Sequence, residues 1–223
     1  MKPLTSMFQI TISPEEIGRL ELASFPGEIQ VIDDFGEDFG KAIRYLKRQK
    51  VIGFDTETRP TFSPDQTSGG TALLQLSGAG KAFLFRIKKM GGIPRRLCAI
   101  LANPGIVKVG AAIHDDVRGL QKFAGFKPEG FVDLQKIVWE YGIRDKSVKK
   151  MTAIILGFKI SKAQQLSNWE AETLSESQRR YAATDAWVCR EMYVKLLASE
   201  KHPLTPEQLA PQQPHPEDKT PKK

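Results

Sequence analysis

The short connection between two apolar runs, residues 72–77 and 81–86, most constrains how this chain can fold. Both runs are rich in residues that favour β-strands, and residues 78–80 are all that separate them. Strands so close in sequence can pair only as an antiparallel hairpin, because a parallel pair needs a crossover of about a dozen residues or more. Part of the predicted sheet is therefore antiparallel.

The rest of the chain alternates between predicted strands and helices, identified from hydrophobic periodicity and helix-start residues. The remaining predicted elements are a strand at 28–33, a helix at 37–49, a strand at 51–57, a helix at 94–102, a strand at 106–110, a helix at 114–124, a strand at 130–133, a helix at 134–141 and a long helix at 176–199. Such alternation is typical of an α/β sheet with crossover helices. We therefore predict a mixed five-stranded sheet flanked by helices.

Three regions are predicted along the chain. Residues 1–27 form an N-terminal extension with a short helix, since Ser13 and Glu16 have the spacing of a capping box. Residues 28–200 form one folded domain of ordinary size. Residues 201–223 contain six prolines among polar residues. Such a segment buries too little surface to offset the entropy of ordering, so we predict a disordered tail.

Net charge and cysteine content indicate the kind of binding partner and the cellular compartment. The formal charge of +7 and the pI near 9.4 suit a polyanion such as nucleic acid, although a basic surface can equally be a solvated face. Cys98 and Cys189 lie in apolar helical patterns, so we expect free thiols and a cytoplasmic location. No segment has the length and hydropathy of a membrane span, so no membrane partner is expected. The oligomeric state is left open.

Asp55 and Glu57 end an apolar strand and are the first candidate site residues. Side chains two apart on a strand point to the same face about 7 Å apart, whereas Thr56 points to the other face. At an effective dielectric constant of about 20, the repulsion between the two acids is roughly 2–3 kcal/mol, so the pair needs cations. An Asp-x-Glu sequence also arises by chance, and an acidic strand end that runs into a solvated loop is the alternative.

Two predicted helices supply further carboxylates. Tyr181 and Asp185 are four residues apart and share the helical face that points to the core, where an unpaired carboxylate is costly. An acid favoured by the helix dipole is the alternative reading of Asp185. In the helix at 114–124, Asp116 lies on the apolar face that points to the sheet, whereas Asp115 points to solvent.

Two other kinds of site are not supported. Residues 77–82 end like a phosphate-binding loop but have Ala82 where Ser or Thr would bind magnesium, and they form a hairpin rather than a helix start. Zinc is not supported either, because the two cysteines are isolated and no histidines are paired.

Four stretches of sequence carry a resemblance to a known family. They are FDTET at 54–58, ALLQLS at 72–77, VGAAIHDDVRGL at 109–120 and SNWEAETLSESQRRYAATDAW at 167–187. In this order they make residues 28–200 resemble the DEDDy class of 3′–5′ exonucleases. The stretches are most similar to the exonuclease domain of the Werner syndrome protein and, less closely, to ribonuclease D.

The resemblance implies a ribonuclease H-like fold and hydrolysis of nucleotides one at a time from a 3′ end, with two divalent ions, Mg²⁺ or Mn²⁺, as cofactors. It assigns Asp55, Glu57 and Asp185 to the ion that binds the attacking water. Asp55 and Asp116 would serve the second ion, and Tyr181 would orient the nucleophile. Four carboxylates carry four negative charges, which two hard divalent ions would offset.

The substrate is open at this point. The 3′ end of DNA or RNA is the expected partner. DNA is the expected substrate, with RNA open as a further one, and a ribonuclease D-like enzyme that trims RNA is the first alternative. A non-catalytic nucleic-acid-binding module is the alternative from another class. We expect contacts to nucleic acid from Thr56, Leu76 and His114.

Overall fold

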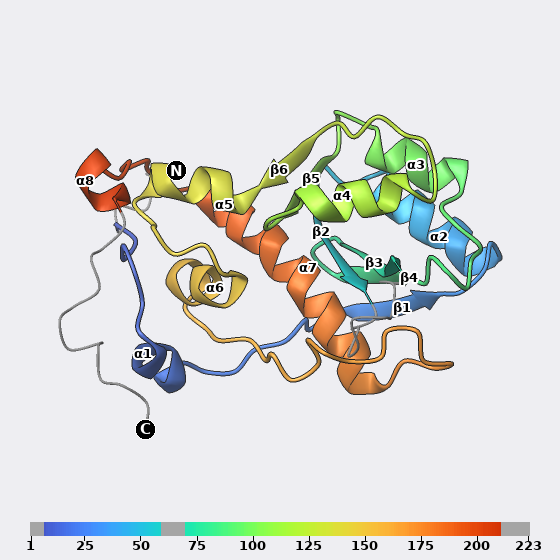
Figure 1. Cartoon of the computed structure of the whole chain (residues 1–223), viewed down its shortest axis with the longest axis horizontal. Coiled ribbons are helices and arrows are strands. Elements are labelled where there is room, and N and C mark those ends of the chain that lie inside the picture. Colours follow the sequence, from blue (N-terminus) through green and yellow to red (C-terminus); the bar gives the residue numbers. More distant parts are fainter. Residues whose placement is uncertain (1–6, 59–69, 211–223) are drawn as a thin grey trace, which may run out of the picture.

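The computed structural model describes residues 7–58 and 70–210 and shows a mixed α/β fold built around a six-stranded sheet (Figure 1). The strands are β1 Glu28–Ile32, β2 Val51–Thr58, β3 Thr71–Ser77, β4 Lys81–Phe85, β5 Val107–Gly110 and β6 Phe131–Asp133. Their order across the sheet is β1-β4-β3-β2-β5-β6. β3 runs antiparallel to β2 and β4, and the other pairs are parallel, so the predicted hairpin is confirmed.

The sheet has six strands, whereas the sequence predicts five. All six strands correspond to segments predicted as strands, including 130–133, and the structure places every one of them in the sheet. The edge strand β6 pairs in parallel with β5 and places Phe131 opposite Lys108. A strand as short as this one is stabilised by its neighbour rather than by its own length. Whether it joins the sheet therefore depends on pairing, which local sequence does not reveal.

Helices cover both faces of the sheet. The helical segments are α1 Pro14–Arg19, α2 Glu37–Leu46, α3 Arg95–Leu101, α4 His114–Gln121, α5 Leu134–Ile137, η1 Val138–Tyr141, α6 Val148–Leu156, α7 Glu176–Leu197 and α8 Pro206–Leu209. One face packs against α2, α3 and α4, whose apolar residues join Phe54, Leu74 and Phe85 in a buried cluster. The other face packs against α7, with α6 beside it. In the described part of the chain, no helix is long and apolar enough to cross a membrane.

The long helix α7 crosses the sheet diagonally and sets the geometry of one face (Figure 1). It begins at a capping box, where the Ser175 hydroxyl accepts a hydrogen bond from the Gln178 N–H and the Gln178 side chain accepts one from the Ser175 N–H. A Cβ atom on Gly53 of β2 would lie 1.7 Å from the carbonyl oxygen of Ala186. A glycine on β2 therefore allows the backbone of α7 to approach the strand closely.

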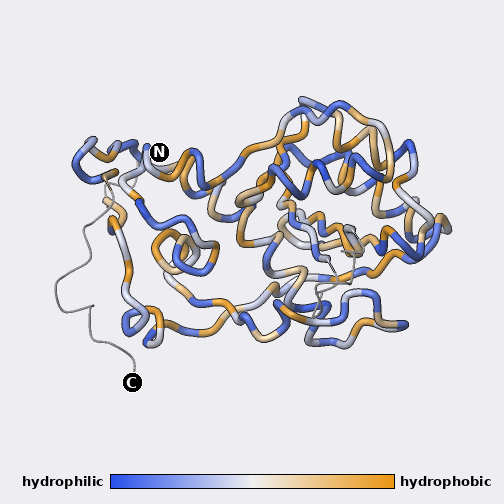
Figure 2. The backbone as a smooth tube through the Cα atoms, in the orientation of Figure 1, coloured by the Kyte–Doolittle hydropathy of each residue, from blue (hydrophilic) through white to orange (hydrophobic). Residues whose placement is uncertain are grey.

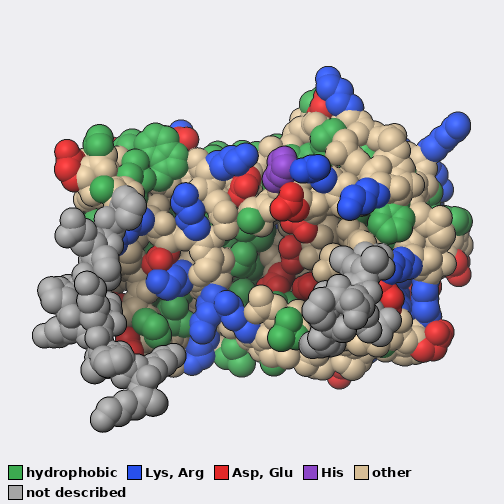
Figure 3. Space-filling model, viewed as in Figure 1, with side chains coloured by type: hydrophobic (Ala, Val, Ile, Leu, Met, Phe, Trp, Pro, Cys, Tyr) green, Lys and Arg blue, Asp and Glu red, His purple; other side chains and the backbone are tan. Residues whose placement is uncertain are grey.

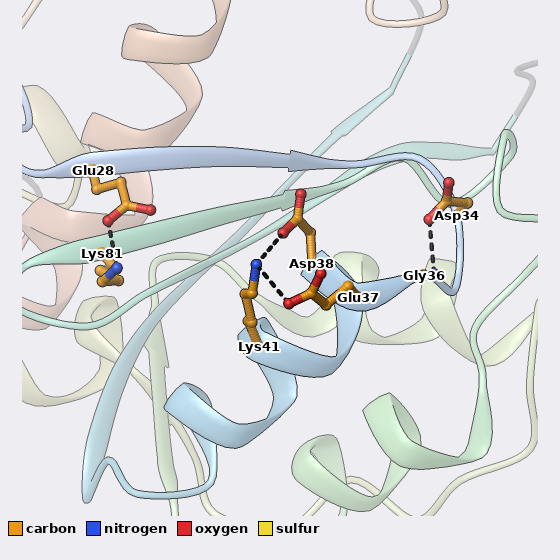
Figure 4. Close-up of polar contacts among 7 residues, drawn as sticks. All are labelled: Glu28, Asp34, Gly36, Glu37, Asp38, Lys41 and Lys81. Carbon is orange, nitrogen blue, oxygen red and sulfur yellow. Dashed lines mark hydrogen bonds and ion pairs between the residues drawn. The ribbon is translucent and has the colours of Figure 1, made fainter.

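Hydrophobic residues gather along the central strands, and hydrophilic residues dominate the outer loops (Figure 2). Figure 4 shows polar contacts near the edge of the sheet that β1 forms. Lys81 at the start of β4 forms an ion pair with Glu28 at the start of β1. On α2, Lys41 Nζ lies 3.1 Å from Glu37 Oε1 and 3.2 Å from Asp38 Oδ1. These pairs are exposed, so burial of apolar side chains stabilises this edge more than they do.

The described residues near both ends of the chain are folded. α1 begins with the predicted capping box of Ser13 and Glu16. Residues 201–210 differ from the predicted disordered tail, because Leu204 is buried, its N–H donates to a carbonyl of η1, and α8 follows it. One anchored apolar side chain thus orders a proline-rich stretch. The rest of the predicted tail, residues 211–223, lies outside the described residues.

Candidate active site

Two acids lie at the end of β2, on the face of the sheet that α7 covers. Asp55 and Glu57 point to this face together with Gly53, whereas Phe54 and Thr56 point to the layer of α2, α3 and α4. This is the division that strand alternation predicts. The predicted pair of acids therefore faces the long helix.

Helix α7 brings a third acid and a tyrosine to the same place. Asp185 precedes Ala186, whose carbonyl group contacts Gly53, so the close packing of α7 on β2 places Asp185 over the strand. Carboxylate oxygens of Asp55, Glu57 and Asp185 lie within 4.8 Å of one another. Tyr181, one turn earlier on α7, lines the same pocket and forms a hydrogen bond with Asp185.

The fourth predicted acid, Asp116, lies beside this cluster on α4. The Thr56 hydroxyl donates a hydrogen bond to Asp116 Oδ1. The negative charge of Asp116 contributes to the raised pKa values of Asp55 and Glu57, which places it within electrostatic reach of both. Thr56 thus has a partner inside the protein, and its predicted contact with nucleic acid stays a prediction.

Burial and mutual repulsion raise the pKa values of these acids. Burial, followed by the charges of nearby acids, raises the pKa of Glu57 to about 8. The same causes raise the pKa of Asp55 well above its usual value. Burial also raises the pKa of Asp185, although its hydrogen bond with Tyr181 opposes part of the effect. The cluster therefore resists ionisation unless positive charge is supplied.

The acids open into a pocket of about 280 Å³ that two lysines also line. Lys149 comes from the first turn of α6, and Lys162 from the loop that precedes α7. Within the described residues neither lysine side chain forms an ion pair, whereas the Nζ atom of Lys150 lies 2.9 Å from Asp145 Oδ1. Figure 3 shows acidic side chains in the hollow at the centre of this face, with Lys and Arg around it. Both lysines are thus available to an anionic ligand.

Two of the predicted contacts with nucleic acid lie outside this pocket. Leu76 is fully buried in the layer of α2, α3 and α4, on the opposite side of the sheet from Asp55, so its predicted contact does not hold. Proximity to the acidic strand does not show which face a side chain occupies. His114 has an exposed side chain and lines a separate groove, where its contact stays a prediction.

Lys149 and Lys162 are pocket residues that the sequence does not identify. A run of basic residues between 144 and 150 is the available signal, but it does not separate Lys149 from Lys150, which is paired elsewhere. Only the fold places Lys149 beside acids that are far away in the sequence.

The set of donor atoms suits divalent cations. Carboxylate oxygens are the ligands that Mg²⁺ and Mn²⁺ prefer, and three carboxylates lie close enough to share one ion. The raised pKa of Glu57 reflects burial and a repulsion that a cation would relieve. Such a site can bind a phosphodiester through the same ions. The residues present therefore fit a metal-dependent reaction at phosphorus.

Known proteins with similar sequences share the part of the chain that carries this site. The profile of a family described as 3′–5′ exonuclease matches residues 32–199. The chain is 35% identical over 154 residues to exonuclease 3′–5′ domain-containing protein 2 of Drosophila melanogaster, covering 66% of this chain and 25% of that protein. It is 32% identical over 150 residues to the bifunctional 3′–5′ exonuclease/ATP-dependent helicase WRN of Mus musculus, covering 66% of this chain and 11% of that protein. The chain thus spans a quarter or less of either relative.

The fold also has a solved counterpart. The crystal structure of Escherichia coli RNase D, described as an exoribonuclease involved in structured RNA processing, matches with a TM-score of 0.67 and 24% sequence identity. The match covers 76% of this chain and 44% of that chain. It confirms the predicted ribonuclease H-like fold.

Proposed function

This chain belongs to the 3′–5′ exonuclease family, and we propose that it hydrolyses DNA from the 3′ end to nucleoside 5′-monophosphates with two divalent ions, Mg²⁺ or Mn²⁺. One observation carries the proposal: oxygens of Asp55, Glu57 and Asp185 lie within 4.8 Å of one another in a pocket that Tyr181 also lines. The family supplies the type of reaction, and the pocket supplies residues whose chemistry fits it.

Each side chain of the pocket has a proposed task. Asp55, Glu57 and Asp185 would hold one ion, and Asp55 with Asp116 would hold the second. Two such ions, when bound, supply an activated water and stabilise the leaving oxygen. Burial and the neighbouring acids raise the pKa of Tyr181, so its hydroxyl stays protonated at neutral pH. Tyr181 therefore orients the attacking water by a hydrogen bond rather than removing its proton.

Lys149 and Lys162 are the proposed contacts to the phosphate groups of the substrate. Both line the acidic pocket, and the positive charge of Lys162 lowers the pKa of Asp185, so Lys162 lies within electrostatic reach of the acids. Contacts to phosphate position a strand without reading its bases. The pair therefore supports an exonuclease with little sequence preference.

We propose nucleic acid as the partner and a reducing, cytoplasmic compartment as the location. The formal charge of +7 favours a polyanionic partner. Neither Cys98 nor Cys189 forms a disulfide, as expected where thiols stay reduced. Fractionation of cells that make the tagged chain tests the location, and recovery with oxidising compartments would contradict it.

An oligonucleotide labelled at its 5′ end tests the activity. With Mg²⁺ or Mn²⁺ we expect a ladder that shortens from the 3′ end, and with EDTA we expect none. Asp185→Asn should abolish the ladder, and Asp116→Asn should slow it strongly. Asp115→Asn is the matched control, because its side chain is 93% exposed beside Asp116 and carries the same charge. An undiminished ladder from Asp185→Asn would contradict the proposal.

Matched DNA and RNA strands test the substrate. RNA is the second candidate because the fold is like that of E. coli RNase D. A contact to the 2′-hydroxyl is what separates the two substrates. Faster degradation of DNA supports the proposal, and faster degradation of RNA replaces DNA as the substrate. Binding without metal-dependent degradation would favour a non-catalytic binding module.

A further inference from the structure

Gln75 is a fully buried amide that has no hydrogen-bond partner. It lies in the middle of β3 with an exposed fraction of 0%. Both its Nε2 and its Oε1 atoms are without a partner in the described structure. Burying an amide without hydrogen bonds is costly, and most buried side chains of this kind are paired. An apolar residue of similar size would avoid this cost.

The neighbours of Gln75 show where a partner can come from. Across the sheet, Gln75 stands opposite Asp55 on one side and Leu84 on the other. Side chains directly opposite in antiparallel strands have Cβ atoms roughly 4.5–5.5 Å apart and share a face of the sheet. The hydrophobic cluster on that side of the sheet includes Ala182 and Ala183 of α7, which offer no polar side chain, and Trp169, whose Nε1 is also buried without a partner in the described structure. Asp55 is the polar side chain that the strand register places directly opposite the amide.

We propose that Gln75 is a positioning residue whose amide N–H donates a hydrogen bond to the Asp55 carboxylate when that carboxylate holds a divalent ion. The inference rests on the proposed metal-dependent function. Carboxylates that hold metal ions are themselves held by hydrogen bonds from residues behind them. Gln75 lies deeper in the sheet than the pocket and does not line it, so it acts through Asp55 and does not touch the substrate.

The proposal predicts two effects of opposite direction for one substitution. Gln75→Met keeps a similar volume and removes the unpaired polar atoms, so the metal-free protein should become more stable. The same substitution removes the donor to Asp55, so the metal-bound state should lose affinity. A residue that served packing alone would not link a gain in stability to a loss of metal binding.

Leu73→Met is the matched control. Leu73 lies two residues earlier on β3, is also fully buried on the α7 side, and stands opposite Glu57 instead of Asp55. The substitution places the same new side chain in the same layer without removing a polar group. It therefore separates the effect of methionine from the effect of losing the amide.

Calorimetric titration with Mn²⁺ and urea unfolding in EDTA, both on the full chain, measure the two effects. For Gln75→Met we expect a dissociation constant for Mn²⁺ about 10-fold higher or more, the range seen when such supporting residues are removed, and a higher urea midpoint. For Leu73→Met we expect wild-type affinity. Wild-type Mn²⁺ affinity in folded Gln75→Met would overturn the proposal.

A measurement on the unaltered protein keeps the test decisive if Gln75→Met does not fold. The side-chain amide resonances of Gln75 should shift when Mg²⁺ is added, because a hydrogen bond forms, and unchanged resonances would overturn the proposal. Failure of the proposed function looks different, because the wild-type chain would then bind no Mn²⁺ and produce no ladder. A wild-type enzyme that is active, beside a Gln75→Met variant that is equally active with equal Mn²⁺ affinity, would reject only the role of Gln75.

Discussion

At the scale of single residues, one strand serves two layers of the protein. The acids Asp55 and Glu57 face α7, while Thr56 between them faces α4 and donates to Asp116. Because side chains alternate along a β-strand, residues 55–57 supply two acids to the α7 side of the sheet and one hydroxyl group to the α4 side. The strand therefore contributes two acids of the site and also positions a third, Asp116, by a hydrogen bond.

The Thr56–Asp116 hydrogen bond predicts that removing the Thr56 hydroxyl group lowers the exonuclease rate. Thr56→Val keeps the shape of the side chain and removes the donor, so Asp116 loses the group that holds it. We expect the exonuclease rate to fall about 10- to 100-fold and the required Mn²⁺ concentration to rise. Thr56→Ser keeps the hydroxyl and should retain most activity. Equal rates and equal Mn²⁺ dependence for the two variants would contradict this role.

The raised pKa of Glu57 predicts how the metal-free protein responds to pH. The carboxyl has an ordinary pKa of 4.5 when the chain is unfolded, and burial with nearby acids raises it to about 8 in the fold. The folded state therefore binds this proton more tightly, and the resulting stability is full below pH 4.5 and is lost as the pH rises toward 8.

Urea midpoints measured in EDTA check this direction. We expect the urea midpoint to decrease as the pH rises from acidic to mildly alkaline. Glu57→Gln, whose side chain does not ionise, should make this decrease smaller. Mg²⁺ at saturating concentration should offset it, since the ion favours the ionised acids. A urea midpoint that rises with pH in the absence of metal would show that the fold does not raise the pKa values of the acids.

At the scale of elements, the contact between α7 and β2 determines where the helix-borne acid lies. Gly53 is the position at which the helix backbone meets the strand, and Asp185 is adjacent to the contacting residue Ala186. Any side chain at position 53 must therefore move the helix or distort the strand.

Gly53→Ala should reduce both stability and activity. Its Cβ atom would lie 1.7 Å from a backbone oxygen, which cannot rotate away as a flexible side chain can. We expect a loss of about 1–3 kcal/mol or more in the free energy of unfolding and a slower exonuclease rate, because Asp185 moves with α7. Gly18→Ala is the control, since a Cβ there has no atom within 4 Å. It should leave the exonuclease rate unchanged and should not lower the free energy of unfolding, because alanine favours a helix more than glycine does. A stable, fully active Gly53→Ala protein would contradict the close approach.

At the scale of the whole molecule, the pocket combines parts from segments that are far apart in the chain. The acids come from β2, α4 and α7, and the lysines from α6 and the loop before α7. Positive charge thus lies at the edge of a negative pocket. The acids alone would repel the phosphates of a nucleic-acid strand. The lysines at the edge of the pocket would attract those phosphates and so allow the strand to approach the acids.

Lys149→Ala and Lys162→Ala should weaken binding of the substrate more than the chemical step. We expect KM to rise with kcat nearly unchanged, and the slope of log(kcat/KM) against log salt to become shallower by about 0.7 for each lysine, the value for one phosphate contact in a single strand. Lys150→Ala is the control, because its side chain pairs with Asp145. Unchanged KM and slope in all three variants would show that phosphate is bound elsewhere.

The features predicted correctly from sequence depend on neighbours in the chain. The hairpin follows from a short connection, the start of α1 from Ser13 and Glu16, and the shared face of Asp55 and Glu57 from strand alternation. Each of these depends on covalent spacing, which the sequence states directly. The resemblance to exonucleases was carried by the same local motifs.

The features that were missed depend on contacts between distant segments. The buried position of Leu76 follows from which layer covers its face of β3. Thr56 and Asp116 meet because α4 packs on that layer, and Lys149 reaches the pocket because α6 packs beside α7. No periodicity in the sequence encodes these distances.

The sequence by itself therefore determined which acids are candidates for the site, their order along the chain and the faces of the local elements on which they stand, because order and face follow from the geometry of consecutive residues. The tertiary structure alone decided that α7 lies close enough at Gly53 to bring Asp185 to Asp55, and that Gln75 lies beside them without a partner. The physical reason is that packing, rather than chain connectivity, sets the distance between side chains on different elements.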